Sequence, residues 1–126
     1  MMSREQKAVR ALFIELKRSR LHEFPKHRKR IDAPNKQGVY VIYSPSVRKV
    51  VHVGRTYKGT AGLRQRLKNH LHGSSSFTEK YLKDGGSSLR NGYTFRCLPV
   101  ASPRRRALLE AYAAGCLCPA HIGLSE

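Results

Sequence analysis

Acidic residues are scarce in this sequence. It contains 8 Asp and Glu residues against 25 Lys and Arg residues, a formal net charge of +17 over 126 residues. No Asp or Glu occurs between residues 33 and 78. A chain this unbalanced repels itself unless an anionic partner relieves the charge. The composition therefore predicts a nucleic acid as the partner, with binding that weakens as salt rises; a merely solubilising surface is the alternative.

Long apolar runs and paired cysteines are also missing. The apolar run near the N-terminus, residues 11–14, is too short for a secretion signal or a membrane span. Three cysteines are an odd number and do not match a secreted disulfide framework. We therefore expect a cytoplasmic protein with reduced thiols and no membrane partner.

The residue patterns predict an α/β (α+β) domain preceded by a basic segment. Apolar residues at helical spacing predict a basic helix over about residues 4–20, and prolines mark residues 22–36 as a connecting segment. From residue 37 to 126 we expect a small three-stranded antiparallel or mixed sheet flanked by helices, in the order β-β-α-(α)-β-α. The predicted strands are 38–43, 49–54 and 93–98, and the predicted helices begin near residues 63, 77 and 102.

One carboxylate, Glu110, stands inside the apolar stretch 107–114 of the last predicted helix. It is the only acidic residue between Asp84 and Glu126. In a basic chain, such a carboxylate either pairs with an arginine or holds a cation. Arg106 lies four residues earlier, at the spacing of an ion pair along a helix. Both alternatives remain open.

Several short motifs follow one another in a fixed order between residues 37 and 122. They are Gly38-Val39-Tyr40, His52-Val53-Gly54, Arg66 followed by His70, Glu110, and Pro119-Ala120-His121. This ordered set resembles the GIY-YIG nuclease domain, whose closing motif usually has asparagine where this sequence has His121. The predicted order of strands and helices is also similar to that of the family.

The resemblance implies hydrolysis of phosphodiester bonds in DNA with one divalent cation, Mg²⁺ or another such as Mn²⁺. Glu110 would hold the metal, Arg66 and Arg55 would neutralise charge in the transition state, and His70 would position the phosphate or relay a proton. These roles agree with general chemistry. Mg²⁺ commonly takes one or two carboxylates together with water and phosphate oxygens, and a bound metal stabilises a departing alkoxide.

The base that activates the attacking water has two candidates. Tyr40 matches the first tyrosine of the family, and His52 stands where the second tyrosine is usual. An ordinary histidine has a pKa near ~6.5 and accepts a proton at neutral pH more readily than a phenol does. We expect one of the two to act as the base. A site that keeps the fold but has lost its activity is the alternative.

The basic residues of the acid-free window are the candidate contacts to nucleic acid, and double-stranded DNA is the expected partner. They are Lys36, Arg48, Lys58, Arg64 and Lys68, joined by His121 of the closing motif. A module that binds DNA or RNA without cleaving it is the alternative function. Nothing in the sequence indicates the oligomeric state or the preferred cleavage site.

Simpler structural roles compete with these hypotheses. Arg66 and His70 fit the solvated flank of an amphipathic helix, and His52 fits an exposed position on a strand. Cys116-x-Cys118 with His121 hints at zinc, although the spacing lacks a clear fourth ligand and buried thiols are the simpler reading.

Overall fold

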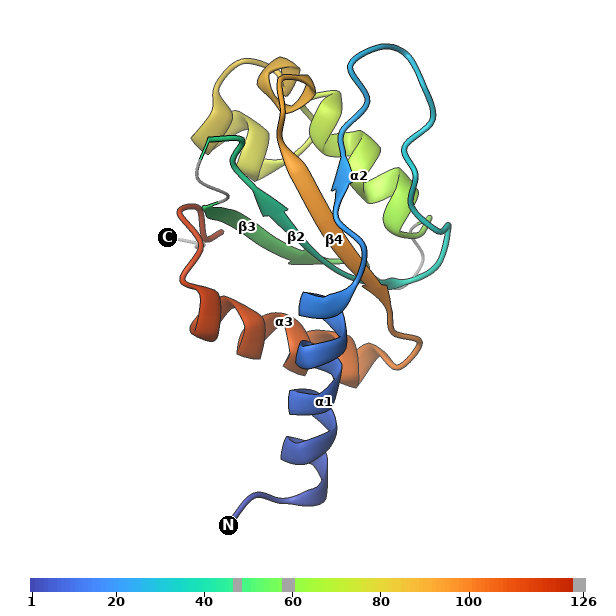
Figure 1. Ribbon diagram of the computed structural model, residues 1–126, viewed down its shortest axis with the longest axis vertical. Helices are drawn as coiled ribbons and strands as arrows, with labels where there is room; N and C mark the ends of the chain where they lie inside the picture. Colours follow the sequence, from blue (N-terminus) through green and yellow to red (C-terminus); the bar gives the residue numbers. More distant parts are fainter. Residues whose placement is uncertain (47–48, 58–60, 124–126) are drawn as a thin grey trace.

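The β-type runs of the sequence form one sheet at the centre of the protein (Figure 1). The computed structural model describes residues 1–46, 49–57 and 61–123. In chain order the elements are α1 (Arg4–Arg18), β1 (His22–Glu23), β2 (Gly38–Tyr43), β3 (Val50–Arg55), α2 (Leu63–Leu71), the π-helical turn η1 (Phe77–Leu82), the 3₁₀ turn η2 (Ser87–Arg90), β4 (Thr94–Pro99) and α3 (Pro103–Leu117). The sheet order is β1-β4-β2-β3, which confirms the α+β class.

The sheet has four strands, so the predicted number of three is wrong, and all of its pairings are antiparallel. The additional strand, β1, lies at the start of the segment predicted as a connection. It pairs His22 with Phe95 and Glu23 with Thr94. The next residue, Phe24, is buried against Phe95, with ring centroids 5.0 Å apart. A strand of two residues is too short to show an alternating apolar pattern in the sequence. It forms because the neighbouring Phe24 is buried in the core.

Alternation along β2 divides the core into two layers. Val39 and Val41 face α1 and α3, whereas Tyr40 and Ile42 face α2 and η1. Figure 1 shows α1 and α3 on one face of the sheet and α2 on the other. β2 is an inner strand of the sheet, paired with β4 on one side and β3 on the other, and all of its residues from 38 to 42 are buried.

The basic N-terminal helix is anchored to the domain through α3. Ser3 and Gln6 form a reciprocal capping box at its start. Phe13 is buried and meets Tyr112 edge to face at 5.2 Å. α1 therefore belongs to the layer that includes α3. No helix within the described residues is long and apolar enough to cross a membrane.

Two motif glycines are required by close packing. A Cβ atom at Gly38 would lie 2.3 Å from the carbonyl oxygen of Leu98, and one at Gly54 would lie 2.3 Å from the hydroxyl oxygen of Tyr40. Tyr40 and Gly54 are directly opposed in the β2–β3 ladder. The missing side chain at Gly54 therefore makes room for the ring of Tyr40.

β3 is the outer strand of the sheet, and the C-terminal segment runs along it. The backbone N–H groups of Ala120 and His121 donate to the carbonyl oxygens of Val50 and Val51, at 3.1 and 2.9 Å. These bonds cover part of an otherwise open strand edge. They also bring the closing motif of the sequence next to the second glycine motif.

We predict that Gly54→Ala destabilises the protein by about 1–3 kcal/mol, because Tyr40 must leave a fully packed position to admit the new methyl group. Gly115→Ala is the control, since a Cβ atom there meets nothing within 4 Å and alanine favours a helix. Denaturant unfolding measures both. Equal stability of the two variants would show that the packing at Gly54 is loose.

Candidate active site

A cleft with a volume of about 290 Å³ lies along the outer edge of β3. Its walls come from β3, α2, α3 and the C-terminal segment. The predicted site residues that line it are His52, Arg55, Arg66, Glu110 and His121. Side chains from both layers reach the cleft because β3 has no further strand beyond it. The edge of the sheet thus gathers residues that are far apart in sequence.

Glu110 pairs with Arg55 within this cleft. Arg55 Nη1 donates to Glu110 Oε1 at 2.5 Å, and the two side chains are 28% and 23% exposed. The alternative prediction that Arg106 pairs with Glu110 is wrong. Its guanidinium is buried, and Nη1 donates to the carbonyl oxygens of Val100 and Ala101 just after β4, both at 2.9 Å. Arg106 therefore secures the β4–α3 connection.

The carboxyl of Glu110 is only partly desolvated. Burial raises its pKa above the ordinary value, although the charge and hydrogen bond of Arg55 and the charge of Arg66 act in the opposite direction. Two arginines surround a carboxylate that still contacts solvent, and this arrangement favours its charged form.

Tyr40 and His70 form a buried hydrogen bond between the sheet and α2. Tyr40 Oη lies 2.6 Å from His70 Nε2, and both side chains are fully buried. On the other side of the ring, His70 Nδ1 lies 2.6 Å from Ser75 Oγ. The prediction that His70 lies on a solvated helix flank is therefore wrong, because η1 and β2 enclose that side of α2.

The surrounding hydrogen bonds determine where the protons lie. Thr78 Oγ1 donates to the carbonyl oxygen of His70, and Ser75 Oγ donates to Thr78 Oγ1. Ser75 Oγ has then used its proton and accepts one from His70 Nδ1. His70 Nε2 is left as an acceptor, so the hydroxyl of Tyr40 donates to it.

Burial keeps both members of this pair neutral. It raises the pKa of Tyr40 well above its ordinary value, although Arg66 opposes the rise. It also lowers the pKa of His70 well below the ordinary value, and the nearby charges of His52, Arg66 and His121 lower it further. At neutral pH the site contains a phenol that donates to an uncharged imidazole.

His52 is buried against two rings, and its predicted exposed position is wrong. Its ring stacks on that of Phe77, with the ring centroids 4.7 Å apart, and its centroid lies 5.4 Å from that of His121. Burial lowers the pKa of His52 to about 3, with further lowering by the charges of His121 and Arg66. The expectation of an ordinary pKa for His52 is therefore wrong. η1 and the C-terminal segment fold over β3 and shield the imidazole from water.

Among the described residues, three of the four unpaired buried side-chain nitrogens belong to residues that line the cleft; the fourth, Arg106 Nε, does not. Within the described part of the chain, His52 Nδ1, Arg66 Nε and His121 Nε2 are buried and have no hydrogen-bond partner in the protein. All three residues line the cleft. Such atoms are rare in native proteins and each requires a partner such as water or a ligand. The cleft is therefore chemically prepared for a polar ligand.

The donor set fits a hard cation held by one carboxylate. Glu110 Oε1 accepts from Arg55, and the carboxylate lines the cleft with 23% of its side chain exposed. Over residues 1–46, 49–57 and 61–123, no three His, Cys, Asp or Glu side chains converge as a metal cluster. Mg²⁺ tolerates this arrangement, since it keeps several waters and binds phosphate oxygens. The hinted zinc site lacks such a cluster among these residues. The alternative of buried thiols is wrong for Cys116 and Cys118, which are exposed.

Three other predicted contacts to nucleic acid lie outside the cleft. Arg64 and Lys68 lie on a different side of α2, and Lys36 is exposed near the start of that helix. Arg48 and Lys58 fall outside the residues that the structure describes. The predicted contacts that are described therefore divide between two regions.

No sequence pattern had indicated several residues of the site. Ser75 and Thr78 complete the hydrogen bonds of His70, and Tyr57 lies beside Arg55, with the guanidinium carbon 4.8 Å from the ring centroid. Comparisons with known proteins supply no further residue. No protein-family model matches the chain, and no curated protein matches it significantly.

We predict that the protein loses stability as pH falls below about 6.5, because the unfolded chain then binds protons that His52, His70 and His121 resist when folded. The stability is complete above this pH and declines toward the folded pKa values. Each such histidine contributes at most about 1.4 kcal/mol per pH unit. Titration of Glu110, whose pKa is raised, acts in the opposite direction.

Denaturant unfolding at several pH values between 7.5 and 5 tests this dependence. His52→Phe keeps a ring against Phe77 and should make the dependence shallower by up to one proton. His27→Gln, at an exposed position, is the control. The same slope in the wild type and both variants would exclude the burial of His52 as a source of pH sensitivity.

Proposed function

We propose that the protein is a metal-dependent endonuclease that hydrolyses phosphodiester bonds in double-stranded DNA. One observation carries the proposal: two arginines, a carboxylate and two histidines with unpaired nitrogens, from distant parts of the chain, line one cleft. The motifs that resemble the GIY-YIG nuclease domain supply these residues. A net charge of +17 favours a polyanionic substrate.

Arg66 and Arg55 would hold the scissile phosphate. Arginine presents a planar set of donors that matches phosphate oxygens. Arg66 lines the cleft, and its buried Nε has no hydrogen-bond partner among the described residues. Arg55 is half-buried and leaves Glu110 when a phosphate competes for it. These donors stabilise the charge that develops on the phosphate oxygens in the transition state.

Glu110 would hold a divalent cation through its carboxylate, with water and phosphate as the remaining ligands. Such a cation, when bound, polarises the phosphate and stabilises the departing oxygen. Glu110 suits this role because its carboxylate is partly exposed and lines the cleft beside the two arginines. Burial raises the pKa of Glu110, and the neighbouring Arg55 and Arg66 favour the charged carboxylate against that rise.

Tyr40 is the better candidate for the base, in place of His52. As water attacks phosphorus, its proton passes to the oxygen of Tyr40 while the hydroxyl proton moves to His70 Nε2. The bond to the leaving oxygen breaks, and that oxygen takes a proton from solvent; His70 then returns its proton to Tyr40 as Tyr40 releases to solvent the proton that it took from water. Burial disfavours an imidazolium, so His70 holds the proton only transiently. His52, a weak base with its pKa near 3, positions the water through Nδ1.

A module that binds nucleic acid without cleaving it is the second candidate. The Arg55–Glu110 pair neutralises the carboxylate, and Tyr40 has no exposed surface. Both observations favour a structural role for these residues. On this alternative, Glu110 contributes an ion pair to stability and no cation binds to it.

We predict that Glu110→Gln reduces Mg²⁺-dependent cleavage of plasmid DNA by at least about 100-fold, because it removes several kcal/mol of charge stabilisation supplied through the metal. Binding to DNA should be equal or tighter, since a negative charge near the phosphate is lost. Glu5→Gln is the matched control. Glu5 also forms an ion pair, with Arg104, but on the exposed surface of α1 and α3.

The two candidate functions differ in the outcome. A purified, folded Glu110→Gln protein with full cleavage activity rules out the metal assignment. A wild-type protein that binds DNA but never cleaves it with Mg²⁺ or Mn²⁺ supports the non-catalytic module.

We predict that Arg66→Lys loses most of the cleavage activity, by about 10²–10³-fold, and retains DNA binding, because lysine cannot reproduce the planar donors of arginine in the transition state. Arg18→Lys, at an exposed position of α1, is the control. Binding is measured by fluorescence anisotropy and cleavage by plasmid nicking. Equal losses of DNA binding and cleavage in Arg66→Lys would show that Arg66 only contacts the DNA backbone.

A further inference from the structure

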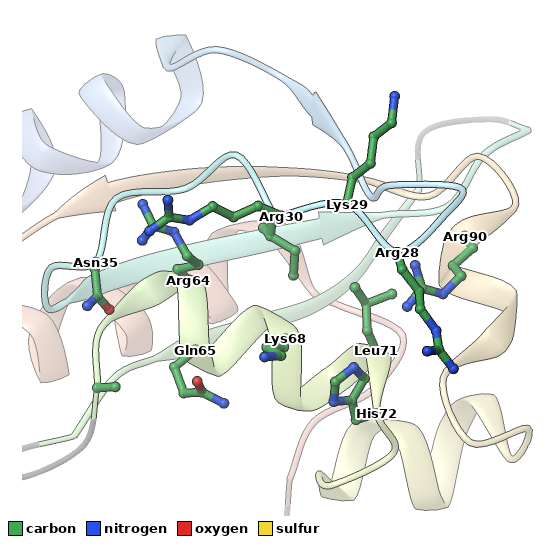
Figure 2. Close-up of a pocket in the computed structure, with 12 residues that line it drawn as sticks. Arg28, Lys29, Arg30, Asn35, Arg64, Gln65, Lys68, Leu71, His72 and Arg90 are labelled. Atoms are coloured by element: carbon green, nitrogen blue, oxygen red, sulfur yellow. The ribbon is translucent and has the colours of Figure 1, made fainter.

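A second and larger cavity, of about 720 Å³, lies between α2 and the segment 28–35 (Figure 2). We call it the basic groove. Its arginines and lysines are Arg28, Lys29, Arg30, Arg64, Lys68 and Arg90. Figure 2 shows Arg30 and Arg64 toward one end and Arg28 and Arg90 toward the other. The positive charge thus extends along the groove.

α2 separates the basic groove from the active-site cleft. Arg64, Lys68 and His72 are spaced by four residues and line the groove. Arg66 lines the cleft, and His70 lies behind it. A step of two residues turns an α-helix by about 200°, so the two sets face nearly opposite sides. One phosphate group cannot contact both sets.

The groove is held in shape by its own basic residues. Arg90 Nη1 donates to the carbonyl oxygens of Pro25 and His27 at 3.0 and 3.1 Å, and Arg64 Nε donates to that of Ala33 at 3.0 Å. Ile31 is buried in the core below the segment. These hydrogen bonds hold the backbone that carries the charged side chains of the groove in a fixed position.

Acidic residues do not compensate this charge. None of the described residues that line the groove is Asp or Glu. The one acidic residue in the sequence from 24 to 36 is Asp32, and its carboxylate lies 3.3 Å from His22 Nδ1. Positive groups this close repel one another unless an anion is present. The groove is best suited to a ligand with several negative charges.

We propose that the basic groove is a second nucleic-acid site, which binds the phosphate backbone of a duplex away from the bond that is cleaved. Arg64, Lys68 and His72 span about 12 Å along the helix, more than one phosphate occupies. No aromatic side chain other than His72 is among the described lining residues, so the groove offers little for base stacking. Backbone contacts position a duplex without reading its sequence. The choice of DNA as the nucleic acid rests on the proposed function.

An anionic membrane is less suitable as the partner. The apolar lining residues Ile31 and Leu71 are buried and offer nothing to insert among lipids. A flat lipid surface also makes poor contact with the inside of a groove. A backbone strand is narrow enough to reach residues on both walls.

The test uses the full chain with three substitutions, Arg28→Gln, Arg30→Gln and Lys68→Gln. These side chains are exposed, and Arg64 and Arg90 are kept because they support the groove. The matched control is Arg4→Gln, Lys7→Gln and Arg18→Gln, which removes the same charge from exposed positions of α1. Thermal unfolding confirms that both proteins fold. Affinity for a 30-base-pair duplex is measured without divalent cations over a range of salt concentrations.

The groove variant should lose about 2–3 units of slope in the plot of log affinity against log salt, because each phosphate contact contributes about 0.9. Its affinity at 0.1 M salt should fall at least about tenfold, and the control should change less than one slope unit. Equal losses in both variants, or no loss in the groove variant, overturn the proposal. Loss of binding to phosphatidylserine vesicles with unchanged duplex affinity assigns the groove to membranes and also overturns it.

This outcome is independent of catalysis. If the groove variant loses duplex affinity and the wild type never cleaves DNA, the second site stands and the nuclease function fails. If the wild type cleaves DNA and the groove variant binds normally, the nuclease function stands and the second site fails.

Discussion

The hydrogen bond between Tyr40 and His70 is the contact on which the rest of the site depends. It joins the central strand β2 to α2, and it forms only because Gly54 leaves space for the tyrosine ring. With the ring in place, α2 presents Arg66 to the cleft. A polar pair in the core is stable because Ser75 and Thr78 satisfy the remaining hydrogen-bonding groups.

The position of the cleft follows from the sheet order. A closed sheet would pair β3 on both sides, whereas here β3 is an edge strand, and among the described residues the C-terminal segment runs along it. The two layers of the core meet at that edge. Residues from opposite faces of the sheet, such as His52 and Arg55, can therefore line the same space.

Local patterns in the sequence predicted the elements that depend on neighbouring residues. The central strand and the start of α3 at Ser102 both follow from such patterns. The partner of Glu110 could not be predicted, because Arg55 lies on β3, 55 residues earlier in the sequence than this position of α3. The burial of His52 could not be predicted either, because residues about 70 positions later in the sequence cover it. His52 and His121 are distant in sequence and lie close together only in the folded protein. β1 was missed because two residues show no periodicity.

The Arg55–Glu110 pair has a consequence for how ligands would bind. Each side chain is the counter-ion of the other, so neither a phosphate nor a cation finds its partner free. A phosphate that takes Arg55 leaves Glu110 unpaired and so strengthens cation binding. A cation that takes Glu110 strengthens phosphate binding by the same factor, since linkage is reciprocal. On the proposed function, the pair makes cation and substrate bind cooperatively, and each alone binds weakly.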